Sequence, residues 1–216
     1  MFVRITAYVM MLLMEVIVLL MMSNMAWSQD RNNQTHDDID TSVAYSWGGT
    51  AIGRFGTGMG DLSPFNELED VITADNYAEV SMENAIGGEV TIEQYGRQAG
   101  NKAKVIQHDS RRSQATIWQE GSANTALITQ TGNQNKAVIG QSGYGHEAWI
   151  NQNGNFNVAA IIQTGAASSL SINQTGHNNQ AYIVDKGGSN YGISQNGNDY
   201  LAIIGGSGIN VYVTQY

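Results

Sequence analysis

The sequence predicts an all-β protein, a β-solenoid of stacked strand-turn-strand rungs with an amyloid-like cross-β arrangement and about 13 short strands. Two observations support this prediction: an apolar residue recurs at a nearly constant spacing, and side chains alternate in character within each repeat. From Ile117 to Ile183 every step between these apolar anchors is eleven residues, and elsewhere the step varies between nine and thirteen. Such a fixed short period is typical of a repeat architecture, so we expect 11-residue units. The anchors are Val80, Ile92, Val105, Ile117, Ile128, Ile139, Ile150, Ile161, Ile172, Ile183, Ile193, Ile204 and Val213.

Residues 1–28 have the pattern of a secretory signal peptide. Arg4 precedes an apolar run from Ile5 to Met22, and the small residues Ala26 and Ser28 stand at the −3 and −1 positions of a cleavage site. The alternative is an uncleaved membrane anchor, but the run of about 18 residues is at the lower limit for spanning. A carboxylate in its middle, Glu15, also disfavours an anchor. We therefore expect cleavage after Ser28 and export of the rest of the chain.

Residues 29–75 form an acidic segment. They carry nine acidic and two basic residues, whereas the whole chain has a formal net charge of −9. No hydrophobic period runs through the segment, and glycines are frequent between Gly48 and Gly60. Asp37, Asp38 and Asp40 are interpreted as a solvated acidic run rather than a cation site. We expect a flexible segment in the monomer.

Residues 76–216 contain the repeats. Within one unit Asn124, Ala126, Ile128 and Gln130 are each two residues apart. Because successive side chains of a strand point to opposite faces, a period of two places these residues on one face. Small Ala and β-branched Ile suit a thin interior, so we expect this face to point inward. The variable positions are expected to face solvent, among them Lys136, Val138, Glu147, Trp149, Ser169 and Ser171.

A glycine follows each strand pattern by two residues. A tight reversal requires a positive φ, which glycine adopts without steric cost. We therefore expect turns at Gly121, Gly132, Gly143, Gly154, Gly165, Gly176, Gly187 and Gly197. Two strands and two turns, about 22 residues, make one flattened rung about 4.8 Å from the next.

The inward Gln and Asn side chains indicate the function. A buried amide needs hydrogen-bond partners, and in a stack the identical amide of a neighbouring rung supplies them. We predict an amide ladder for self-assembly formed by Gln94, Gln107, Gln119, Gln130, Gln141, Gln152, Gln163, Gln174, Gln195 and Gln215, with Asn101, Asn124, Asn135, Asn157 and Asn179.

The main alternative is a soluble solenoid that does not assemble. Soluble solenoids need polar capping repeats. No such cap is recognisable, and the repeat pattern continues to residues 211–216. An uncapped sheet edge is a template for another chain, so we expect assembly.

The repeat resembles the curlin repeat, Q-x-G-x-x-N-x-A-x-I-x-Q. Spacing and residue identity recur together in QEGSANTALITQ, QTGNQNKAVIGQ and QNGNFNVAAIIQ, which start at Gln119, Gln130 and Gln152. Curlins are the subunits of curli, the functional amyloid on the outer surface of certain bacteria. The resemblance implies a secreted structural subunit of an extracellular, pilus-like cell-surface fibre in adhesion and biofilm matrix. It further implies partners: copies of the chain itself, the major curlin subunit, and the outer-membrane curli secretion pore with its accessory factors.

The family has a major fibre subunit and a minor, nucleating subunit. Lys and Arg residues are scattered through the repeats, and Gly and Asn recur in successive turns; both features resemble the minor subunit. The paired turn residues are Gly121 with Asn124, Gly132 with Asn135, Gly154 with Asn157, and Gly176 with Asn179. Two departures are that no Lys or Arg follows Lys186 and that the acidic segment is longer than the family's usual pre-repeat stretch. We expect a nucleator, with a major fibre subunit as the alternative.

Composition disfavours other classes of function. The chain has no basic stripe for phosphate contacts, so no nucleic-acid partner is expected. It has no cysteine, and its four His residues lack metal-ligand spacing. The acidic residues of the repeats lie on different turns, so we expect neither an enzyme nor a cofactor.

Overall fold

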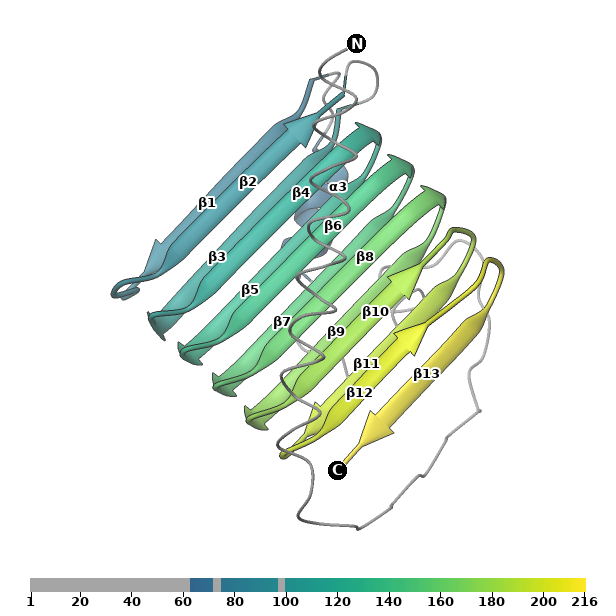
Figure 1. The fold of residues 1–216 in the computed structure, drawn as a ribbon. Coiled ribbons are helices and arrows are strands. Elements are labelled where there is room, and N and C mark those ends of the chain that lie inside the picture. The colour runs from purple at the N-terminus through teal and green to yellow at the C-terminus, as the bar shows by residue number, and fades with distance from the viewer. Residues whose placement is uncertain (1–62, 72–74, 97–99) are drawn as a thin grey trace, which may run out of the picture. The chain divides into compact units, whose positions relative to one another are not determined.

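A computed structural model describes residues 63–71, 75–96 and 100–216. Thirteen β-strands and one helix lie within this described part, and the strands extend from Tyr77 to Gln215. The predicted all-β solenoid is therefore confirmed (Figure 1). The predicted signal peptide with its cleavage after Ser28, and residues 29–62 of the acidic segment, lie outside the described residues.

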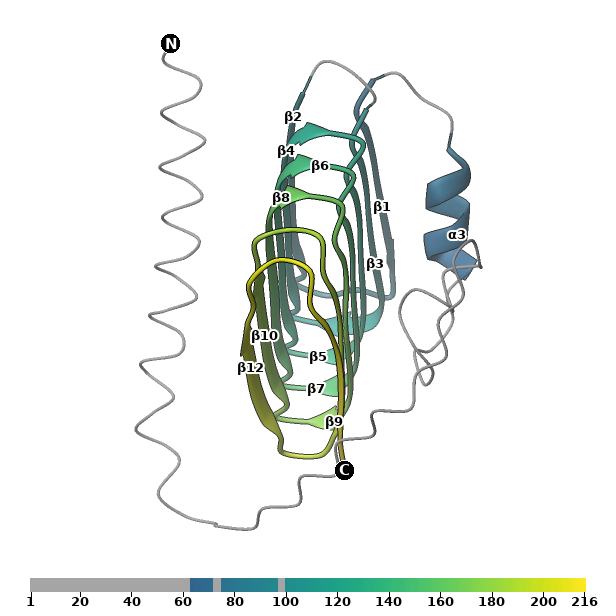
Figure 2. The same ribbon diagram turned by 90° about the vertical axis from the view of Figure 1, so that its right-hand side faces the viewer.

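The strands form two sheets, and consecutive strands alternate between them (Figure 2). Sheet A contains β1 (Tyr77–Glu83), β3 (Lys102–Arg111), β5 (Thr125–Asn133), β7 (Glu147–Asn155), β9 (Ser169–His177), β11 (Asn190–Asn196) and β13 (Asn210–Gln215). Sheet B contains β2 (Glu89–Tyr95), β4 (Gln114–Ser122), β6 (Lys136–Tyr144), β8 (Val158–Ala166), β10 (Gln180–Asp185) and β12 (Tyr200–Ile204). Each turn of the solenoid thus contributes one strand to each sheet.

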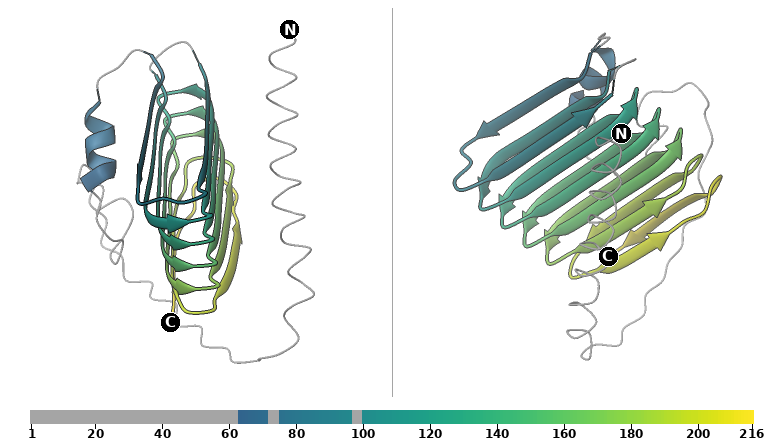
Figure 3. Two further views of the ribbon diagram at one scale, coloured as in Figure 1. Left: turned by 90° about the vertical axis from the view of Figure 1, so that its left-hand side faces the viewer. Right: turned by 45° about the horizontal axis from the view of Figure 1, so that its top comes forward.

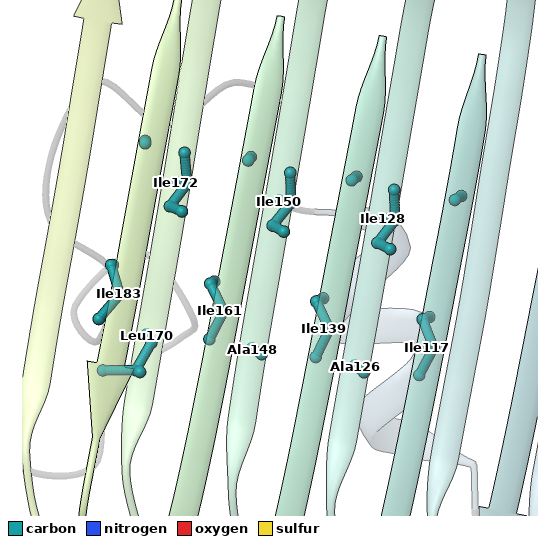
Figure 4. Close-up of a cluster of buried hydrophobic side chains, with 14 of the residues drawn as sticks. Ile117, Ala126, Ile128, Ile139, Ala148, Ile150, Ile161, Leu170, Ile172 and Ile183 are labelled. Atoms are coloured by element: carbon teal, nitrogen blue, oxygen red, sulfur yellow. The ribbon is translucent and has the colours of Figure 1, made fainter. Parts of the chain in front are cut away.

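Neighbouring strands pair in parallel and in register with the sequence repeat. Ile128 of β5 pairs with Ile150 of β7, and Ile139 of β6 pairs with Ile161 of β8. The Ile and Ala columns of the two sheets form one continuous core, in which Ile128 and Ile150 are fully buried (Figure 4). Burial of a side chain of this size stabilises by about 1.5–3 kcal/mol, so each turn adds a similar increment of apolar burial.

The helix α3 (Ser63–Asp70) lies in the acidic segment, whose flexibility in the monomer stays a prediction. Pro64 occupies the first turn, where its missing N–H is not needed. Phe65 and Leu68, three residues apart, share one face of the helix and are buried. The helix packs against the outer face of sheet A (Figures 2 and 3). No helix in the described ranges is long and apolar enough to cross a membrane.

Candidate functional site

The Gln residues predicted for the ladder form two columns inside the solenoid. In sheet A the Nε2 of each Gln donates to the Oε1 of the next, over Gln107, Gln130, Gln152, Gln174, Gln195 and Gln215. In sheet B the same contacts link Gln94, Gln119, Gln141 and Gln163. The distances are 2.8 or 2.9 Å, and every donor points toward the strand later in the chain. Each column is therefore directional: among the described residues, the Oε1 of its first Gln receives no amide from an earlier Gln, and the Nε2 of its last Gln donates to no later Gln.

Most of these amides also bridge the two sheets. The Nε2 of Gln130 donates to the carbonyl oxygen of Gln114 at 3.0 Å, and the Nε2 of Gln141 donates to that of Thr125 at 3.1 Å. In each case the amide comes from one sheet and the carbonyl from the first residue of a strand in the other. Both side chains are fully buried. Since a buried amide with satisfied partners strengthens a hydrogen-bonded chain, the columns hold neighbouring turns and facing sheets together.

Two further columns lie at the corners, where the residue before each strand points inward. Before the strands of sheet B the backbone N of each corner residue donates to the previous side-chain oxygen, over Ser113, Asn135, Asn157 and Asn179. Before the strands of sheet A the acceptors are Asn76, Asn101, Asn124, His146, Ser168 and Ser189. The predicted Asn101, Asn124, Asn135, Asn157 and Asn179 are thus divided between two corners.

Sequence reasoning missed the Ser and His members of the corner columns. Ser113, His146, Ser168 and Ser189 occupy positions where the repeat carries Asn, and all are fully buried. The signal was their place in the repeat rather than their residue type. A hydroxyl or an imidazole nitrogen can accept the same backbone hydrogen bond as an Asn oxygen. The corner therefore selects for an acceptor at this position.

His146 occupies a corner as a hydrogen-bond acceptor. Its Nδ1 accepts a hydrogen bond from the backbone N of Ser168 at 3.4 Å. Burial lowers the pKa of His146 below its usual 6.5. Protonation of Nδ1 would turn this acceptor into a donor that faces another donor, which agrees with the direction of the shift.

Asp185 interrupts the Gln column of sheet B. It pairs with Gln163 in register and takes the position of the next Gln. Its Oδ2 accepts hydrogen bonds from the Oγ of Ser168 and from the backbone N of Gly187. The Nε2 of Gln163 donates instead to the backbone oxygen of Ser168, at 2.9 Å. The sheet B column therefore ends at Gln163, whereas the sheet A column continues to Gln215.

The predicted turn glycines all have positive φ: Gly121, Gly132, Gly143, Gly154, Gly165, Gly176, Gly187 and Gly197. Five of their backbones also approach the next turn closely, those of Gly121, Gly132, Gly143, Gly154 and Gly165: a Cβ on Gly143 would collide with the carbonyl oxygen of Gly165. That approach serves the corner amides, because the Nδ2 of Asn124 donates to the carbonyl oxygen of Gly143 at 3.2 Å. Gly and Asn of the repeat thus act together in the turn.

The outward positions are not uniformly exposed. Lys136 is exposed and Val138, Glu147 and Ser169 are half-buried, but the prediction was wrong for Trp149 and Ser171, which are buried. Trp149 clusters with Phe65 of α3 and with Leu127. Ser171 lies beside Gly192, where the ring of Tyr212 occupies the space of the missing side chain.

No metal site is found in the described part of the chain, where no group of three or more His, Cys, Asp or Glu side chains converges. The organised polar groups are instead the amide columns, which are periodic along the stack. At the end of a stack, such columns present backbone N–H and C=O groups in register with an amide row.

Comparison with known families agrees with this arrangement. Residues 111–143 and 146–176 match the family model of the curlin associated repeat. These residues include β4, β5, β7 and β8, and all but the last residue of β6 and of β9. A search of the curated proteins finds no matching relative. Over these two stretches the chain is therefore similar to the curlin associated repeat.

Proposed function

We propose that this chain is a secreted structural subunit of an extracellular curli-type fibre, and that it acts as the minor subunit that nucleates polymerisation of the major curlin. The observation that carries the proposal is the directional amide column, buried over successive turns and continuous through the region that matches the curlin repeat. The role is structural, since the column recognises another rung rather than a small substrate.

The amide columns support a nucleating role for a physical reason. Ordering the first rungs fixes backbone and side chains before any neighbouring rung contributes hydrogen bonds, at about 1–2 kcal/mol per residue for the backbone alone. A stack that is already folded presents N–H and C=O groups and an amide row in register. A newcomer that stacks on it avoids the unfavourable first step.

The proposed setting follows from the curlin resemblance. After signal-peptide cleavage the chain would pass through the outer-membrane curli secretion pore, join the major subunit at the cell surface, and contribute to adhesion and biofilm matrix. Neither a cofactor nor a nucleic acid takes part in this proposal.

A seeding experiment tests the nucleating role. Residues 29–216, added at a small molar fraction to a purified major curlin, should shorten the lag of thioflavin T fluorescence. Removing residues 114–157 joins Ser113 to Val158, which occupies the same register position as Gln114. This variant loses two whole turns without a change of register and should seed less well. The control lacks residues 29–62, keeps every turn and should seed as well as the full chain.

The outcomes separate the alternatives. A chain that enters fibres without shortening the lag would be a major-type fibre subunit. A chain that neither seeds nor enters fibres would be a soluble solenoid, and the assembly argument would fail.

A further inference from the structure

The first turn of the solenoid presents an open edge. β1 and β2 are the terminal strands of sheets A and B, and within the described residues nothing pairs with their outer sides. Val80 and Met82 belong to inward columns but are 48% and 45% exposed, because no turn of the described residues stacks before them. An unpaired edge of this kind invites another strand, so the residues on it decide whether one stacks there.

The apolar columns of this edge would accept a further turn. Val80 is in register with Val105, and Ile92 is in register with Ile117. The core positions therefore match those inside the stack, and apolar burial alone would favour addition. Any resistance of this edge to a further turn must therefore come from the polar columns.

One corner of the first turn lacks both of its amides. Met82 stands in the Gln column, in register with Gln107. Gly88 precedes β2 and stands in the corner column, before Ser113. A turn added on this side would have to donate a Gln amide to position 82, where the Met side chain carries no oxygen.

The missing amide already has a visible effect inside the stack. The Oε1 of Gln107 is buried and has no hydrogen-bond partner among the described residues. In every later turn of sheet A, the Nε2 of the preceding Gln fills this position, as Gln107 does for Gln130 at 2.9 Å. Met82 therefore terminates the column rather than merely varying it.

Acidic side chains complete the difference between this edge and the interior. Four outward positions of the first turn carry carboxylates: Glu79, Glu83, Glu89 and Glu93. Two of them face cationic or ionisable groups of the second turn, with Lys104 Nζ 3.2 Å from Glu79 and His108 Nδ1 3.3 Å from Glu83.

Beyond the second turn three of these four columns carry no charged side chain, whereas the Glu89 column continues with Lys136. The Glu79 column continues with Leu127, Trp149 and Ser171. The Glu93 column continues with Trp118, Gly140 and Ile162. A turn stacked before β1 and β2 would bring uncharged side chains within about 4.8 Å of the carboxylates and strip water from them.

We propose that the first turn, β1 and β2, is a closed end of the stack that resists addition of a further subunit. This inference rests on the proposed function. A head-to-tail junction between two copies of this chain would have to use the closed end of one copy, so copies add to one another slowly. The chain is thereby suited to stand at the start of a fibre, and the subunit that stacks on it is a different curlin.

The experiment compares self-assembly with seeding for residues 29–216. The open-end variant replaces Met82 by Gln and Glu79, Glu83, Glu89 and Glu93 by Gln. Alone, it should polymerise with a lag several-fold shorter than that of the parent chain. Both proteins should seed a purified major curlin equally, because seeding uses the other end.

A matched control removes charge inside the stack. Glu120→Gln with Glu147→Gln leaves the first turn unchanged, so its self-assembly should follow that of the parent chain. The proposal is overturned if the open-end variant self-assembles no faster than the parent, or if the control accelerates as much. It is also overturned if opening the end changes the seeding of the major curlin as strongly as self-assembly. If no protein in the set seeds the major curlin, the proposed nucleating function fails, whereas the closed end is judged by the self-assembly comparison.

Discussion

The Gln columns can be tested at one residue in the middle of the stack. Gln141 accepts a hydrogen bond from Gln119 at 2.8 Å and donates to Gln163 at 2.8 Å and to the carbonyl of Thr125 at 3.1 Å. Gln141→Met keeps similar volume and removes all three hydrogen bonds. Leaving a buried polar group unsatisfied costs about 1–3 kcal/mol, so the total loss should be at least about 3 kcal/mol.

The measurement is the guanidinium midpoint at which the assembled β-structure is lost, followed by circular dichroism. A loss of about 3 kcal/mol is about a hundredfold in the equilibrium constant, which shifts the midpoint clearly. The control is Gln114→Met on the neighbouring strand β4. The Gln114 side chain is exposed and donates only to Glu89, at 3.2 Å, so its replacement should change stability by less than about 0.5 kcal/mol. Equal shifts for the two variants would refute the assignment of faces and of the column.

Three further predictions concern the turns, the helix and pH. Gly143→Ala should lower the denaturation midpoint strongly, because its Cβ would collide with the next turn, whereas Gly145→Ala should lower it less, since no atom lies within 4 Å of that Cβ. Phe65→Ala should detach α3 and shift the fluorescence of Trp149 to the red without loss of β-sheet signal, because the two side chains share one cluster. Burial lowers the pKa of His146, so the unfolded chain binds its proton more tightly and stability should fall as pH drops below 6.5; in His146→Asn, the same titration should show a weaker fall.

The solenoid could be predicted because the repeat acts at several levels at once. Within each 11-residue unit, the period of two predicts a strand and also predicts which face of that strand is buried. In-register parallel pairing then places equal residues above one another, as for Ala137 with Ala159 and Gln141 with Gln163. The inward amides follow from the pattern alone, since a polar residue at a buried position must find a partner.

Features that depend on contacts outside the repeat could not be predicted in this way. The helix α3 has only two buried apolar residues, Phe65 and Leu68, in a stretch without a period. Its docking on sheet A also explains the burial of Trp149, whose position in the repeat suggested solvent. Tertiary contacts here override a local pattern.

The turn backbone was only half predicted. Each predicted glycine has a positive φ, but a second residue in many turns does as well, including Ala123, Gln134 and Phe156 with φ of 54°, 56° and 59°. A left-handed conformation is unfavourable for residues with a Cβ. In these turns backbone hydrogen bonds between successive corners hold it, such as the bond from the N of Phe156 to the carbonyl oxygen of Asn133 at 2.9 Å.

The two Gln columns are interrupted in different turns, so each complete turn keeps the inward Gln of at least one sheet. Met82 removes the sheet A amide from the first turn, where Gln94 of sheet B remains. Asp185 removes the sheet B amide from a later turn, where Gln174 of sheet A remains and donates to Gln195 at 2.9 Å. Each break therefore weakens one sheet while the other column still fixes the register of the stack. A break inside the stack is bridged on both sides by paired turns. The break at Met82 lies on an open edge, where an incoming strand has no paired turn on its other side. Loss of the amide, which the interior tolerates at Asp185, therefore becomes a barrier to addition at the end.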